Sequence, residues 1–307
     1  MTRRGWSLFA AMSLIWGVPY LLIKVAVGGV APPVLVLARV AVGAGLLLPL
    51  AVRRNELAPL RARWRWLALF ALIEIIVPWL LLSEAETRLS SSLSGLLIAS
   101  VPILVAIFGR LTGGRERLTM TRWTGLLIGL AGVTLLVAGG AHGNAAAVAE
   151  VLLVAVCYAT GPLIAARRLA GLPSLGMTAA CLGFAAIVYA PLAALSWPDK
   201  MPSVAVLGAL AGLAVICTAV AFLLFFALIA EAGPARAAVI TYVNPAVAVG
   251  LGVLVLGERL TVVMAIAFVA ILGGSVLATR SGRREGALAA AGGVPTRYPS
   301  AEPVPRD

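Results

Sequence analysis

The sequence has little charge for its length. Of its 307 residues only 12% are charged, whereas a soluble domain carries about 25%. Hydrophobic residues make up 62% of the chain, and the mean hydropathy is +1.05. Apolar runs close to the ~20 residues that a helix needs to cross the hydrocarbon core follow one another. A water-soluble globular domain is therefore excluded, and the pattern predicts an all-α integral membrane protein.

The residues of ATP-driven and metal-dependent proteins are scarce as well. The two lysines, Lys24 and Lys200, end no Gly-rich phosphate loop, so a Walker A motif is excluded. One histidine, His142, and three cysteines without a CxxC spacing give no metal-ligand pattern. A serine hydrolase would find only His142 as its histidine base. The sequence therefore predicts no catalytic residue, no metal and no cofactor.

Hydropathy predicts ten transmembrane helices. Their expected positions are 6–27, 32–52, 65–83, 92–111, 121–140, 147–166, 174–195, 203–228, 236–256 and 261–279. The first apolar segment is longer than that of a signal peptide, so we expect it to be retained as a helix. Residues 281–307 are rich in Gly, Pro, Ser and Arg and predict a disordered cytoplasmic tail.

Arginines give most of the formal net charge of +12. They lie between apolar spans, where topology explains them better than nucleic-acid binding does. With the N-terminus in the cytoplasm, the inside flanks hold Arg3, Arg4, Arg53, Arg54, Arg61, Arg63, Arg65, Arg110, Arg115, Arg117, Arg122, Arg167, Arg168, Arg236, Arg280, Arg283 and Arg284. The outside flanks hold Lys24, Arg88, Lys200 and Arg259. Because cytoplasmic loops carry the excess of Lys and Arg, we expect both termini inside, and the Arg-rich, Lys-poor composition favours a bacterial inner membrane.

The chain resembles itself across its two halves. Glu116-Arg117-Leu118-Thr119 recurs as Glu258-Arg259-Leu260-Thr261, which is 142 positions later. Prolines and glycines repeat at the same offset or one residue more, as in the pairs Pro49 and Pro191, Gly132 and Gly274, Pro19 and Pro162, and Pro102 and Pro245. This register predicts a five-helix repeat over 6–140 and a second over 147–280. An odd number of helices inverts the second copy in the membrane, which is typical of secondary transporters.

Several of these residues resemble one family. They are Leu14-Ile15-Trp16-Gly17 followed by Lys24, Arg39 in the second span, Asn244-Pro245 in the ninth, Gly257-Glu258-Arg259-Leu260-Thr261 before the last, and Gly273-Gly274 within it. They resemble EamA-type members of the drug/metabolite transporter superfamily, over essentially residues 6–280. The resemblance implies ten helices in two inverted halves around a central cavity. It also implies export of amino acids, other metabolites or drugs.

Two charged residues lie within apolar spans. Glu74 is about ten residues into the third span, or ~15 Å deep, where an ionisable group predicts a functional site. It could bind a proton, bind an amine or pair with Arg39. Arg39 could bind a carboxylate or phosphate, with snorkelling or the capping of carbonyls as the alternative. Lys24, near the outer end of the first span, is expected to snorkel.

Aromatic and amide side chains complete the predicted substrate site, in which packing is the alternative for each member. The set is Trp16, Tyr20, Trp79, Tyr158, Tyr242 and Asn244. Four prolines near mid-span remove backbone hydrogen bonds and are predicted hinges: Pro19, Pro102, Pro162 and Pro245.

The sequence thus predicts a secondary transporter that exports small organic solutes across the plasma membrane by alternating access. Its expected partners are a small-molecule substrate, the lipid bilayer and, for coupling, a proton. An importer or a lipid-carrier flippase of the same fold stays open, as does an intramembrane lipid-modifying enzyme. The substrate, the coupling ion and the oligomeric state do not follow from the sequence.

Overall fold

A computed structural model describes residues 1–111, 120–140 and 144–279, and within them the chain is helical without a β-strand. The predicted tail 281–307, the first Glu-Arg-Leu-Thr segment at 116–119 and His142 lie outside the described residues. The helices of the first half are α1 (Arg3–Ile15), α2 (Pro19–Ala26), α3 (Pro32–Arg53), a 3-10 turn η1 (Ala58–Arg63), α4 (Trp64–Ala71), a π-helix η2 (Leu72–Ile76), α5 (Val77–Arg88), α6 (Ser91–Ile98), α7 (Val101–Leu111) and α8 (Met120–Gly140).

The second half repeats this order. Its helices are α9 (Ala145–Arg168), α10 (Ser174–Ala194), α11 (Val204–Ala211), a π-helix η3 (Gly212–Val220), α12 (Ala221–Ala232), the short α13 (Pro234–Ala237), α14 (Ile240–Leu256) and α15 (Val262–Thr279). Eight continuous stretches are long and apolar enough to cross a membrane, and two shorter apolar helices, α14 and α15, complete the predicted ten. The fold class predicted from hydropathy is confirmed.

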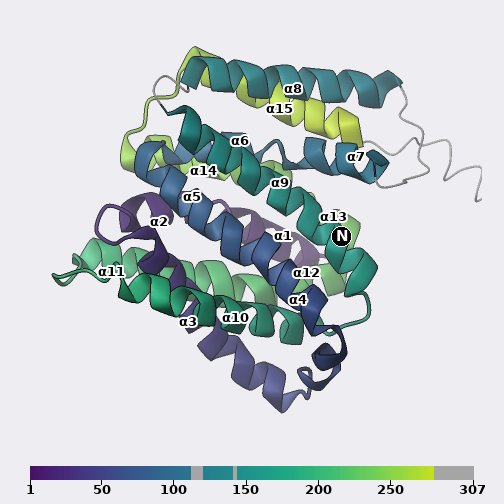
Figure 1. Cartoon of the computed structure of the whole chain (residues 1–307). Coiled ribbons are helices and arrows are strands. Elements are labelled where there is room, and N and C mark those ends of the chain that lie inside the picture. The colour runs from purple at the N-terminus through teal and green to yellow at the C-terminus, as the bar shows by residue number, and fades with distance from the viewer. Residues whose placement is uncertain (112–119, 141–143, 280–307) are drawn as a thin grey trace, which may run out of the picture.

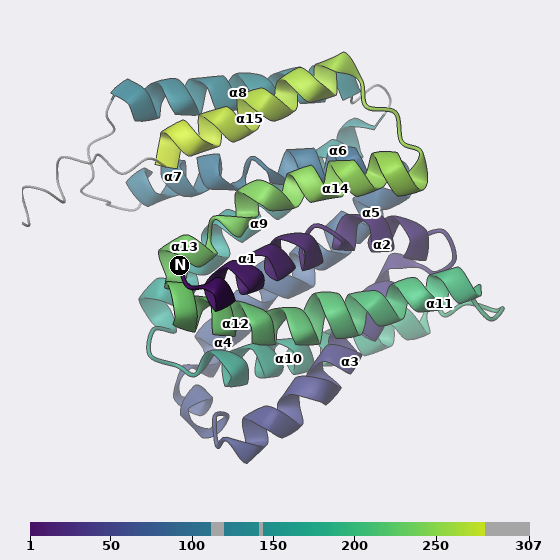
Figure 2. The ribbon, with the colours of Figure 1, turned by 180° about the vertical axis from the view of Figure 1, so that it is seen from behind.

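Equivalent helices of the two halves pack against each other. The last spans, α8 and α15, lie side by side along one edge of the bundle (Figure 1), and the second spans, α3 and α10, pack along the opposite edge (Figure 2). Between these edges the first and sixth spans fill the middle. Because each half has five spans, equivalent helices run in opposite directions, as an inverted repeat requires.

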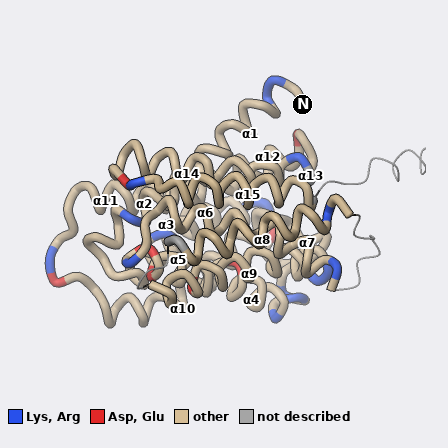
Figure 3. Tube along the Cα trace, turned by 90° about the horizontal axis from the view of Figure 1, so that it is seen from above, with Lys and Arg blue, Asp and Glu red and all other residues tan. Residues whose placement is uncertain are grey.

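Charge is confined largely to the helix ends (Figure 3). The end of the bundle at which the N-terminus lies has the arginines that follow α3, precede α4 and end α7 and α9, and we refer to it as the arginine-rich end. The opposite end holds Lys24, Arg88, Lys200 and Arg259, and we refer to it as the arginine-poor end. The long apolar middles leave only a few ionisable groups between the two ends.

The four predicted hinge prolines differ between the halves. In the first half, the first span is interrupted at Trp16–Val18 immediately before Pro19, and the fourth is interrupted between Ile98 and Val101, next to Pro102. Proline is tolerated there because the first turn of a helix needs no donor. Pro162 and Pro245 lie inside the continuous helices α9 and α14. The two halves therefore share a sequence pattern but have different backbones at equivalent sites.

Glycines set how closely the two last spans approach. A Cβ on Gly274 would collide with the backbone of Gly129, and one on Gly125 would meet the backbone of α15. The Gly125-x-x-x-Gly129 spacing thus serves close helix packing. Gly208 has no such role, because its Cβ would point into open space.

We expect Gly274→Ala to destabilise the bundle by about 1–3 kcal/mol, because the added methyl group has no room between the backbones of α8 and α15. The adjacent Gly273→Ala is the matched control: its Cβ meets nothing, and alanine favours a helix. Thermal unfolding of the purified proteins in detergent measures both. Equal melting temperatures for the two variants would contradict this account of the packing.

Candidate substrate site

A buried arginine lies at the centre of the bundle. Arg39 of α3 is only 8% exposed, and its guanidinium lies 3.6 Å from the ring centroid of Trp79 on α5. Its Nε donates a hydrogen bond of 2.8 Å to Oγ1 of Thr218, which donates onward to the carbonyl of Leu213. An aromatic face and a hydroxyl thus stabilise the cation, and its terminal amino groups make no hydrogen bond to the described residues.

The two π-helices occupy equivalent positions in the two halves. Glu74 lies in η2, and the residue 142 positions later, Ile216, lies in η3. A π-helix widens the backbone and re-aims side chains, and such segments are frequent at functional sites. Here η3 supplies Thr218 to Arg39, and η2 presents Glu74. Each π-helix therefore contributes a polar side chain to the middle of the bundle.

Glu74 is half-buried, with one carboxyl oxygen buried against a glycine. Its Oε2 has no hydrogen-bond partner among the described residues, and a Cβ on Gly161 of α9 would collide with that oxygen. Glu74 and Arg39 form no ion pair with each other in the described part of the chain. The structure therefore does not contain the ion pair between Glu74 and Arg39 that the sequence left open. Each of the two side chains faces other groups.

Two tyrosines lie near the side chains of Arg39 and Glu74. Tyr158 of α9 lies within electrostatic reach of both Arg39 and Glu74, and Tyr20 of α2 lies within reach of Arg39 and Tyr158. The structure therefore brings together five of the predicted residues, from four spans, as a cluster that we name the polar centre: Tyr20, Arg39, Glu74, Trp79 and Tyr158.

The other predicted residues have contacts elsewhere. Trp16, at the break in the first span, packs against Phe225 and Phe222 of α12, with ring centroids 4.6 and 6.1 Å apart. The amide nitrogen of Asn244, oriented to satisfy its neighbours, donates to the carbonyls of Ile240 and Ser13. Tyr242 is half-buried on α14. Trp16 and Asn244 thus join helices next to the break.

Glu258, the first residue of the second Glu-Arg-Leu-Thr segment, has a structural role that the motif itself did not indicate. Its carboxylate accepts hydrogen bonds from the backbone N–H and the hydroxyl of both Ser91 and Ser92, at the start of α6. Gly257, with φ +66°, ends α14 and turns Glu258 toward α6, and a Cβ on Gly252 would collide with this cap. Burial raises the pKa of Glu258, but these hydrogen bonds outweigh it and hold the pKa below its ordinary value.

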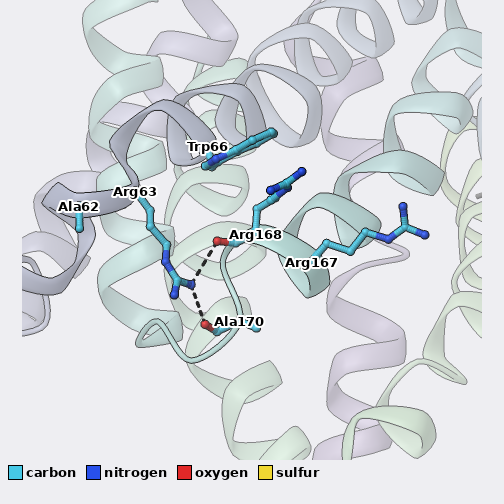
Figure 4. Close-up of a pocket in the computed structure, with 6 residues that line it drawn as sticks. All are labelled: Ala62, Arg63, Trp66, Arg167, Arg168 and Ala170. Atoms are coloured by element: carbon cyan, nitrogen blue, oxygen red, sulfur yellow. Dashed lines mark hydrogen bonds between the residues drawn. The ribbon is translucent and has the colours of Figure 1, made fainter.

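A shallow hollow of about 390 Å³ opens at the arginine-rich end (Figure 4). Arg63 donates two hydrogen bonds across it, to the carbonyls of Arg168 and Ala170, and the Arg168 guanidinium lies over the Trp66 ring. These contacts tie the start of α4 to the end of α9. The hollow lies at the surface, away from the polar centre, and we assign no substrate to it.

Comparison with known proteins agrees with this architecture. The family model described as "EamA-like transporter family" matches residues 3–138 and 146–280. The chain is 32% identical over 275 residues to the uncharacterized inner membrane transporter YedA of Escherichia coli (strain K12), covering 88% of each chain. It is 24% identical over 260 residues to the uncharacterized transporter YvbV of Bacillus subtilis (strain 168), covering 83% of this chain and 84% of that one.

A solved crystal structure shares the fold, with a TM-score of 0.65 and 24% identity over 90% of this chain and 96% of the other. Ten apolar spans in two repeats around a buried polar centre define a multi-pass membrane transporter. The chain belongs to the EamA-like transporter family, which confirms the resemblance inferred from its motifs.

We expect Glu258→Gln to lower the melting temperature at neutral pH, because the amide cannot accept four hydrogen bonds as a carboxylate does. The pKa of Glu258 is depressed in the folded protein, so its stabilisation is present above the unfolded value of about 4.3 and is lost as the pH falls further. The stability difference between wild type and variant should therefore shrink in acid. Asp199→Asn, in an exposed loop at the same end, is the control, and a difference independent of pH would refute the cap.

Proposed function

We propose that this transporter exports small organic metabolites, amino acids or similar molecules, or drugs by alternating access. One observation supports this substrate class: the buried Arg39 and the half-buried Glu74 have side chains of opposite charge, do not pair with each other, and both lie within reach of Tyr158. A molecule with an acidic and a basic group would neutralise both. Arg39 would receive its carboxylate, Glu74 its amine, and Trp79 and Tyr20 its apolar part.

The differences between the halves support alternating access. The first and fourth spans are interrupted at their prolines, whereas their inverted counterparts, the sixth and ninth, are continuous. If each half adopts in turn the backbone that the other has now, the polar centre becomes open to the other side of the membrane. Pro19, Pro102, Pro162 and Pro245 would be the hinges of that exchange.

An importer, a flippase and a lipid-modifying enzyme would each require different features of the protein. An importer would use the polar centre equally well, since direction follows gradients, and a flippase would need the cluster to open toward lipid. A lipid-modifying enzyme would need reactive groups at one membrane face. In the hollow at the arginine-rich end, Arg63 and Arg168 are held by backbone carbonyls and a tryptophan ring, which fits a structural role better.

Export can be tested by untargeted metabolite profiling of medium and cells, for strains expressing wild type, Arg39→Gln, Glu74→Gln or empty vector. We expect a compound to rise outside and fall inside only with wild type. Each variant should reduce its export by about tenfold or more, because a charge-assisted hydrogen bond contributes about 1.5–3 kcal/mol. Arg259→Gln, in an exposed loop, should export normally. The reverse distribution would indicate an importer, and full export by both variants would refute the assigned site.

The proposed orientation has both termini in the cytoplasm, with the arginine-rich end inside. In a variant whose three buried cysteines are replaced, we expect Asp199→Cys to react with a membrane-impermeant maleimide added to intact cells. Asn55→Cys, in the loop after α3 at the other end, should react only after the cells are opened. The opposite pattern would invert the assignment.

A further inference from the structure

A second buried carboxyl lies near the arginine-poor end. Glu86, in the last turn of α5, is 0% exposed, and neither of its carboxyl oxygens has a hydrogen-bond partner among the described residues. An ionised carboxylate buried without partners costs several kcal/mol or more. The arrangement is therefore stable only when the carboxyl carries a proton. Glu86 lies just beyond the predicted third span, 65–83, so hydropathy did not place it in the membrane.

The nearest cation does not neutralise Glu86. Lys24 of α2 donates from Nζ to the backbone carbonyls of Glu86 and Leu89, at 2.7 and 2.8 Å, and makes no ion pair with the Glu86 carboxyl within the described residues. The Lys24 ammonium thus caps the end of α5 at the arginine-poor end. Tyr20 and Glu258 also lie within electrostatic reach of Glu86, and neither can supply a positive charge.

The remaining charged groups on the elements packed against α5 have partners or lie elsewhere. Arg39 of α3 is held by Trp79 and Thr218. Glu150 of α9 forms an ion pair with Arg88, at 2.6 Å. Glu74 of η2 faces Gly161 on α9. Lys24 is thus the one cation near the Glu86 carboxyl among the described residues, and it attracts the carboxyl without forming an ion pair with it.

Two contacts close the bundle over Glu86. Lys24 ties the first span to the end of the third, and Glu258 ties the loop before the last span to the start of the fourth. Leu89, which Lys24 binds, and Ser91, which Glu258 binds, are only two residues apart. Opening of this end, by movement of the first span away from the third or of the loop before the last span away from the fourth, would have to break these contacts and would expose Glu86 to water.

We propose that Glu86 is a proton-binding site controlled by this closure. While the arginine-poor end is closed, the carboxyl holds its proton. When the end opens, the O–H bond breaks, the proton passes to external water and a solvated carboxylate remains. Closure then requires that the carboxylate take up a proton again from that side. This step would make the transport cycle depend on the external pH, and in this respect it rests on the proposed function.

The test needs no substrate. Dicyclohexylcarbodiimide enters apolar sites and adds to protonated carboxyl groups, and mass spectrometry locates the resulting N-acylurea. With wild-type protein in lipid vesicles, we expect an adduct on Glu86 that persists well above the ordinary glutamate pKa of about 4.3. Glu84, two residues earlier and partly exposed, should stay unmodified at neutral pH and serves as the internal control. Absence of an adduct on Glu86 at neutral pH would overturn the proposal.

The two lysines of the chain test whether closure controls the proton. Lys24→Gln should weaken the closure and move the pH dependence of Glu86 labelling down, toward the ordinary glutamate value. Loss of the Lys24 charge alone would raise the midpoint of Glu86 labelling. The direction of the shift therefore separates a weakened closure from a lost charge. Lys200→Gln, exposed at the same end, should behave as wild type. An unchanged or raised midpoint in Lys24→Gln would refute the closure.

A transport measurement follows once an exported compound is known. Glu86→Gln resembles the protonated carboxyl and should remove the dependence of export on external pH while the protein stays folded. An unchanged pH dependence would overturn the role of Glu86 in transport. The labelling results stand apart from this assay, so failure of the export proposal and failure of the proton site can be distinguished.

Discussion

A lipid bilayer offers no water to a polar group, so each polar group in the hydrocarbon region needs a partner within the protein. Most of this structure satisfies that constraint. Arg39 rests on Trp79 and Thr218, Lys24 caps the end of α5, and Glu258 caps the start of α6. Against this background the unpartnered oxygens of Glu74 and Glu86 stand out. Their burial is unfavourable for stability alone, which is why both are assigned functions that involve another species, a substrate amine or a proton.

The architecture could be read from the sequence because hydropathy is a local signal and the repeated motif marks the two halves. Each of the ten predicted spans corresponds to a helix, with ends that agree to within a few residues except in the third, which extends to Ala58–Arg88. The backbone differences between the halves could not be read in this way. Pro19 and Pro162 look alike in sequence, yet only the first follows a break. Packing around each proline decides this, since Gly17 lets α14 approach the break closely.

The site was predicted less completely, for a related reason. Residue type and depth identified Arg39, Glu74 and the aromatic residues as candidates. They did not indicate which of these side chains lie close together. Trp16 and Asn244 have the chemistry of binding residues, yet their contacts join helices. Glu258 was visible as part of a repeated motif, but its role depends on Ser91 and Ser92, which are remote in sequence. Such long-range partners arise from the fold, and a single sequence contains no record of them.

The two halves share an architecture but not a chemistry. At 142 positions beyond Lys24, Arg39, Glu74, Trp79 and Glu86, the second half has Ala166, Cys181, Ile216, Ala221 and Leu228. A symmetric distribution would bury twice as many charges, and each buried ion carries a large desolvation penalty. One set of ionisable groups suffices for a single central site under the alternating access that we propose, because that site would serve both sides of the membrane in turn. The second half contributes what orients that set: Thr218 for Arg39, Gly161 for Glu74 and Glu258 for the closure beside Glu86. The repeat thus provides a symmetric frame of helices, and the asymmetry of its residues places one polar site within that frame.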